Sequence, residues 1–99
     1  MKNAFYVHII LPDVFSKQFY DLIPKQREVI NRLMEKRIVL SYSLDMDRKN
    51  VWAFIEAKNE TEVMDILSTF PIIRFIKISI HELAFYDSAR VSFPDLIMN

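Results

Sequence analysis

Three ionisable residues could form an acid–base row across a β-sheet, namely His8, Glu56 and Lys77. His8 falls late in a predicted first strand, Glu56 late in a third strand taken to run parallel to it, and Lys77 early in an antiparallel fourth strand. These positions would bring the three side chains level across neighbouring strands, roughly 5 Å apart per strand. A carboxylate and an ammonium beside an imidazole could orient a histidine base and attract an anion. We therefore take His8, Glu56 and Lys77 as candidate catalytic residues. A satisfied polar network inside a subunit interface is the alternative.

Aromatic side chains would wall a pocket around this row. The substrate-binding candidates are Tyr6, Trp52, Phe54, Phe75 and Arg74. Arg74 could hold a carboxylate bidentately at the pocket mouth, and the alternative is a solvated loop arginine. Aromatics at this spacing are also typical of an interface core. The chain has only two histidines and no cysteine, and His81 lies at the far end of its strand from His8, so we expect no metal site.

The composition excludes several classes of protein. Glycine is absent, which rules out a glycine-rich phosphate loop or dinucleotide fingerprint in its usual form, and no cofactor is expected. Thirteen basic residues balance thirteen acidic ones, whereas nucleic-acid binders usually carry a basic excess.

No apolar run approaches the ~20 residues that span a bilayer, and no signal-peptide pattern begins the chain. We expect a cytoplasmic protein that contacts no membrane, and the balanced charge argues against a nucleic-acid partner.

The hydrophobic periodicity predicts four strands and two helices. One helix begins at a Ser16 cap and runs to about Lys36, with a kink or break at Pro24. The other begins at Asn59, where Glu62 completes a capping signature, and ends by Pro71. The predicted strands cover residues 4–10, 38–45, 51–57 and 73–83.

The order βαββαβ predicts an α+β, ferredoxin-like domain, in which a four-stranded antiparallel sheet has both helices on one face. The helices would cover Phe5, Val7, Ile9, Ala53, Ile55, Ile76, Ile78 and Ile80. The opposite face would show Tyr6, Trp52, Phe54 and Phe75. Since 52% of the residues are apolar, a great deal for a small monomer to bury, we expect a second copy of the chain to cover this face. The partner would be the protein itself, as a homodimer or higher oligomer.

The chain divides into a domain over residues 1–86 and an apolar tail over residues 87–99. The tail is too short to fold alone and too apolar for a solvated linker. We expect the tail to dock at a subunit interface, and docking on its own domain is the alternative.

Two stretches resemble the muconolactone delta-isomerase family, within the dimeric α/β-barrel group of ferredoxin-like domains. They are Ile10-Leu11-Pro12 after the first strand and the segment ETEVMDILSTFPIIRFIKISIHELA over residues 60–84. The resemblance implies two sheets packed face to face in a dimer and cofactor-free isomerisation of a small lactone or related carboxylate. The resemblance assigns no catalytic role to any particular residue of this chain.

The sequence therefore predicts a small-molecule-binding protein similar to this family, and the resemblance implies a cofactor-free isomerase that acts by proton transfer on a small lactone or related carboxylate. One alternative is a non-catalytic oligomeric binding or scaffold protein of the same fold. Another is an RNA-binding module, because the segment VWAFIEA from Val51 has the spaced aromatics on which RNA-recognition motifs stack bases.

Overall fold

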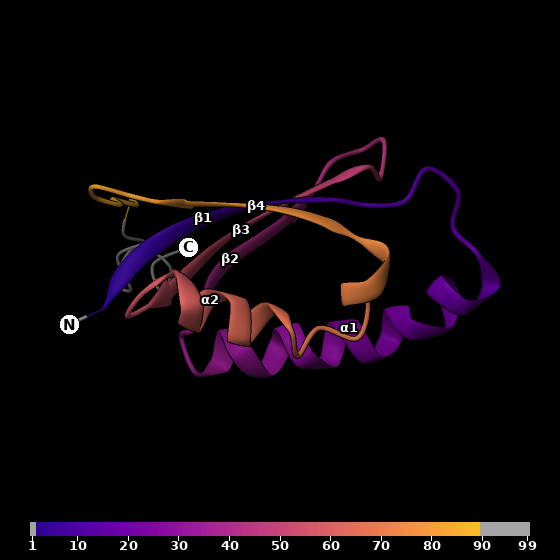
Figure 1. Ribbon diagram of the computed structural model, residues 1–99, viewed down its shortest axis with the longest axis horizontal. Coiled ribbons are helices and arrows are strands. Elements are labelled where there is room, and N and C mark those ends of the chain that lie inside the picture. The colour runs from indigo at the N-terminus through magenta and orange to yellow at the C-terminus, as the bar shows by residue number, and fades with distance from the viewer. Residues whose placement is uncertain (1, 90–99) are drawn as a thin grey trace, which may run out of the picture.

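The computed structural model describes residues 2–89, which form the expected order of four strands and two α-helices. The strands are β1 (Asn3–Ile10), β2 (Val39–Leu44), β3 (Asn50–Ala57) and β4 (Lys77–Glu82). The helices are α1 (Lys17–Glu35) and α2 (Glu60–Leu67). Figure 1 shows both helices on one face of the sheet, while the other face, here called the open face, carries no helix. No helix within residues 2–89 is both long and apolar enough to cross a membrane.

The sheet has the strand order β2-β3-β1-β4, and every neighbouring pair is antiparallel. This arrangement confirms the predicted ferredoxin-like α+β fold. The strands alternate buried and half-buried residues, as expected of a sheet with one covered face. The core under the helices includes Phe5, Val7 and Ile9 of β1, Val51, Ala53 and Ile55 of β3, and Ile30, Val63 and Leu67 of the helices.

Side-chain and backbone caps set the ends of α1. Ser16 Oγ accepts a hydrogen bond from the Phe19 N–H at 3.1 Å, as its sequence position predicts. At the other end, Arg37 takes a left-handed backbone with φ 59°, its N–H donates to the Met34 carbonyl, and the Ile38 N–H donates to the Leu33 carbonyl. This is a Schellman motif, in which glycine is usual. Because the chain has no glycine, an arginine occupies the left-handed position.

Two expectations about local structure need correction. The sequence predicts a kink or a break at Pro24, and helix α1 is continuous through this residue, so the break does not occur. Pro24 is exposed, and the exposed Tyr20 side chain lies on the same side, so the Tyr20 carbonyl that loses its helical partner can meet water. The long last strand is also shorter than predicted, because residues Ile73–Phe75 form one turn of 3-10 helix before β4 begins at Lys77.

The 3-10 turn moves Phe75 to the opposite side of the sheet from the one predicted. Its ring packs edge-on against Phe19 of α1, with 5.6 Å between centroids, and it joins the core instead of the open face. Strand alternation cannot be extended through a helical turn, which is why the prediction for Phe75 is wrong.

The chain after β4 begins to cover one end of the open face. The Leu83 N–H donates to the Ala4 carbonyl at 3.0 Å, and the Tyr86 ring packs on Phe54 with centroids 4.7 Å apart. The predicted docking of the tail falls mostly on residues 90–99, which lie outside the described residues.

Candidate functional site

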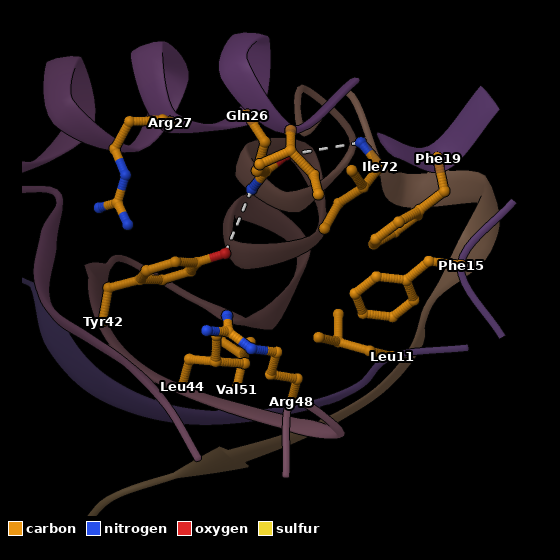
Figure 2. A pocket seen from close by; sticks show the side chains of 11 residues that line it. Leu11, Phe15, Phe19, Gln26, Arg27, Tyr42, Leu44, Arg48, Val51 and Ile72 are labelled. Carbon is orange, nitrogen blue, oxygen red and sulfur yellow. Dashed lines mark hydrogen bonds between the residues drawn. The ribbon is translucent and has the colours of Figure 1, made fainter. Parts of the chain in front are cut away.

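A cavity of about 260 Å³ opens between α1 and the β2–β3 hairpin, on the helical side of the sheet. Its walls are mostly apolar, and Figure 2 shows Phe15, Phe19 and Leu11 on one side with Leu44 and Val51 below. The volume is slightly below the roughly 300–1,000 Å³ that drug-sized ligands occupy. The cavity therefore has room for a small organic molecule.

A buried amide lies at the deep side of this cavity. Gln26 of α1 is 6% exposed and is the only buried polar residue among those the structure describes. Its Nε2 donates to the Tyr42 hydroxyl at 3.5 Å, and its Oε1 accepts from the Ile72 N–H at 3.4 Å (Figure 2). Both distances are at the long end for hydrogen bonds. Gln26 therefore ties the helix to β2 and to the segment after α2, and its amide and the Tyr42 hydroxyl supply polar groups inside an apolar cavity.

Two arginines stand at the rim of the cavity. Arg27 follows Gln26 on α1, and Arg48 comes from the β2–β3 turn. The only ion pair within residues 2–89 joins Lys17 to Asp21, so neither rim arginine has a carboxylate partner there. A guanidinium presents a planar set of donors that matches a carboxylate or phosphate. The rim is therefore suited to hold an anionic group.

The hairpin turn fixes the backbone that carries Arg48. Arg48 adopts a left-handed conformation with φ 57°, and the Asp45 carboxylate accepts hydrogen bonds from the N–H groups of Lys49 and Asn50 at 2.9 and 3.0 Å. The Lys49 carbonyl accepts from the Leu11 N–H at 2.8 Å, which attaches the turn to the end of β1. These bonds hold the Arg48 backbone over the cavity even though a left-handed non-glycine residue costs roughly 1–2 kcal/mol.

Tyr42 keeps its proton in this setting. Burial raises the pKa of the Tyr42 phenol, and the Gln26 hydrogen bond and the Arg27 charge oppose that rise only in part. A neutral phenol can donate to an acceptor on a ligand. The residues that line the cavity include no carboxylate and no imidazole, so they supply donors and cations but no general base.

The three predicted catalytic residues do not come level on the sheet. Strands β1 and β3 run antiparallel, so His8 pairs with Trp52, while Glu56 pairs with Ala4 at the other end. Glu56 therefore lies four residues along β3 from the level of His8, roughly 13 Å away. Lys77 pairs with Ile10 and is a diagonal neighbour of His8 across β1 and β4. The predicted acid–imidazole–ammonium row is wrong because it took β3 to be parallel to β1.

His8 has different partners. Its Nε2 lies 2.9 Å from Asn50 Oδ1, and its ring stacks on Trp52 with 5.7 Å between centroids and 6° between planes. Asn50 Nδ2 in turn donates to Asp45 Oδ2 at 2.9 Å. A chain of hydrogen bonds therefore runs from the Asp45 turn to an imidazole on the open face.

The predicted substrate-binding residues lie in two separate places, and none of them lines the cavity. Tyr6, Trp52 and Phe54 are half-buried on the open face, where the Tyr6 and Phe54 centroids are 5.4 Å apart. Arg74 is exposed on the 3-10 turn with its guanidinium 5.9 Å from the Phe75 centroid. Within residues 2–89, no three His, Asp or Glu side chains gather closely enough to hold a metal ion.

Sequence reasoning missed the polar residues of the cavity, which are Gln26, Arg27, Tyr42 and Arg48. One signal was present for Gln26, because it lies four residues after Leu22 and four before Ile30 on the apolar stripe of α1. A polar residue at such a position must find buried partners. Nothing in the sequence indicated that the turn would bring Arg48 to the same place.

The fold and the cavity thus define a small ferredoxin-like domain with a candidate ligand site under its hairpin. No protein-family model matches the chain, and no curated protein matches it. Among solved structures, the fold is similar to that of an uncharacterized protein, TM1266, from Thermotoga maritima, with a TM-score of 0.56 and 10% sequence identity. The match covers 84% of this chain and 99% of that chain. At this identity the similarity concerns the fold alone.

Proposed function

We propose that the protein binds a small, mainly apolar organic anion in the cavity between α1 and the β2–β3 hairpin. The observation that carries the proposal is the combination of a buried amide, Gln26, at the deep side with two rim arginines that have no carboxylate partner within residues 2–89. Apolar walls remove water from a ring or a short hydrocarbon chain, and a few polar groups fix its orientation. A carboxylate at the mouth would meet Arg27 and Arg48.

The geometry supports binding more directly than catalysis. Proton-transfer isomerisation, which the resemblance to muconolactone isomerases implies, needs a base beside the substrate. Such a base would have to come from outside the eleven residues that line the cavity. Isomerase activity and a cytoplasmic location therefore stay predictions.

We also propose that the open face binds a second copy of the chain. Strands β1 and β3 each have eight residues and strands β2 and β4 each have six, so at ~3.3 Å per residue and ~4.8 Å per strand the face measures roughly 440 Å². Two such faces give about 900 Å², which is the size of a weak or transient contact. Glu56 and Lys77 lie at opposite ends of this face. A two-fold contact between identical faces can therefore set each Glu56 against the Lys77 of the other copy.

Isothermal titration with benzoate and with neutral benzamide tests the ligand proposal. We expect benzoate to bind more tightly than benzamide, and Arg27→Gln to weaken benzoate binding about tenfold, since a hydrogen bond to a charged group contributes roughly 1.5–3 kcal/mol. Arg32→Gln is the matched control, because Arg32 is exposed on α1 and does not line the cavity. Equal affinity for acid and amide, or equal losses in both variants, would contradict the proposal.

A further inference from the structure

The deep side of the cavity presents hydrogen-bonding groups that contacts within the chain use only in part. Gln26 Nε2 donates to the Tyr42 hydroxyl at 3.5 Å, and Gln26 Oε1 accepts from the Ile72 N–H at 3.4 Å. An amide nitrogen carries two hydrogens, and an amide oxygen can accept two hydrogen bonds. Since each of these contacts uses one of the two, Gln26 keeps one N–H and one acceptor position for a ligand.

The orientation of the Gln26 amide follows from its partners. The Ile72 N–H can only donate, so the amide must turn its oxygen to Ile72 and its nitrogen to Tyr42. The Tyr42 oxygen is therefore the acceptor in its bond with Gln26, and the hydroxyl hydrogen remains to be donated elsewhere. Burial raises the pKa of the Tyr42 phenol, which keeps this hydrogen in place at neutral pH. The deep side thus offers two donors and one acceptor close together.

The space between these polar groups and the rim fits a single ring. A cavity of about 150 Å³ can hold benzene, so one of about 260 Å³ has room for a six-membered ring with a substituent at each end. Figure 2 shows Gln26 and Arg48 on opposite sides of the cavity. The Tyr42 ring lies across the cavity from Phe15 and Phe19 (Figure 2), whose ring centroids are 4.5 Å apart. A ring among these aromatic side chains would direct one end to the arginines and the other to Gln26.

We infer that the ligand of this cavity is a ring-bearing organic acid with a hydroxyl group at the end opposite its carboxylate. The inference deepens the binding function proposed above and rests on it. A hydroxyl both accepts and donates, so it can accept from the Tyr42 O–H and donate to Gln26 Oε1. A carbonyl can only accept, and a methyl group does neither. A site that hydrogen-bonds a ligand hydroxyl discriminates against analogues without it, because its own buried polar groups then stay unpaired.

Isothermal titration of the full chain with 4-hydroxybenzoate and 4-methylbenzoate tests the inference, because the two acids differ only in the group opposite the carboxylate. A cavity that selects by apolar contact alone binds the methyl compound more tightly. We expect the opposite order, with 4-hydroxybenzoate at least about tenfold tighter. 4-Formylbenzoate, whose carbonyl accepts but cannot donate, should bind less tightly than 4-hydroxybenzoate. If 4-formylbenzoate binds as tightly or more tightly, the hydroxyl is not what the site selects and the inference is overturned.

Tyr42→Phe removes the hydroxyl that would donate to the ligand. We expect this variant to lower the ratio of the 4-methylbenzoate and 4-hydroxybenzoate dissociation constants at least about threefold. Tyr20→Phe is the matched control, because Tyr20 is exposed on α1 and does not line the cavity. The control should keep the ratio of the unmodified protein. An unchanged ratio in Tyr42→Phe overturns the inference.

The titrations separate this inference from the proposed function. If benzoate binds more tightly than benzamide but 4-hydroxybenzoate binds no more tightly than 4-methylbenzoate, the anion site stands and the inference is overturned. If no acid binds at millimolar concentration, both are overturned. The comparison of the acids uses the unmodified protein, so it decides the inference even if Tyr42→Phe does not fold.

Discussion

The His8 Nε2 atom lies 2.9 Å from Asn50 Oδ1, and this contact joins the open face of the sheet to the hairpin turn. Asn50 uses its amide nitrogen to bind Asp45, so only its oxygen is free for His8. The neutral imidazole must therefore carry its hydrogen on Nε2. We expect ¹⁵N NMR to show the Nε2–H tautomer of His8 at pH 8, and a mixture of tautomers in Asn50→Ala. His81 supplies an internal reference, and an Nδ1–H tautomer of His8 in the unmodified protein would contradict the assignment.

Asp45 should make stability depend on pH in acid. Hydrogen bonds from Asn50, first from its side chain and then from its backbone, lower the pKa of the Asp45 carboxyl below the ordinary 3.8. The unfolded chain therefore takes up this proton at a higher pH than the folded chain does. The contribution of Asp45 is fully present above its ordinary pKa and is lost as the pH falls through the lowered value. We expect the difference in unfolding free energy between the unmodified protein and Asp45→Asn to shrink from pH 5 to pH 2, as measured by urea denaturation. If the difference in unfolding free energy does not change with pH, the charge of the Asp45 carboxylate does not stabilise the turn.

Gln26 should contribute to stability through its two buried partners. Replacement by leucine removes the donor to the Tyr42 hydroxyl and the acceptor for the Ile72 N–H. The added apolar contact of the leucine offsets part of that cost. We expect Gln26→Leu to lower the free energy of unfolding by about 1 kcal/mol. Gln18→Leu, at an exposed position of the same helix, should change it by less than about 0.5 kcal/mol. If the two variants unfold at the same urea concentration, the Gln26 contacts contribute nothing.

Arg48 and Arg37 form a matched pair, because each is a non-glycine residue with a left-handed backbone. Glycine relieves the strain at such a position, so Arg48→Gly and Arg37→Gly should each raise the unfolding free energy by about 0.5–1 kcal/mol. Only Arg48 lines the cavity, so only Arg48→Gly should weaken benzoate binding. An equal effect of the two variants on binding would place the anion elsewhere.

Local signals in the sequence predicted much of this fold. Ser16 and Asn59 cap their helices as their positions indicate, and the alternation of residues 5–9 and 51–57 assigns the covered and open faces correctly. The errors arise where a local pattern gives way to longer-range geometry. Phe75 packs in the core because a 3-10 turn interrupts the strand. His8 and Glu56 do not come level because β3 runs antiparallel to β1, and not parallel as predicted. The cavity could not be predicted, since it depends on where a glycine-free turn places Arg48.

Two-dimensional NMR of the ¹⁵N-labelled protein during titration with benzoate tests the central claim most directly. The side-chain NH₂ signals of Gln26 and the backbone signals of Leu11 and Ile72 report from three sides of the cavity. We predict saturable shifts at these signals and at the Arg27 and Arg48 guanidinium groups, with little change at Trp52 on the open face. Shifts confined to Trp52 and its neighbours, or none at millimolar benzoate, would contradict the account.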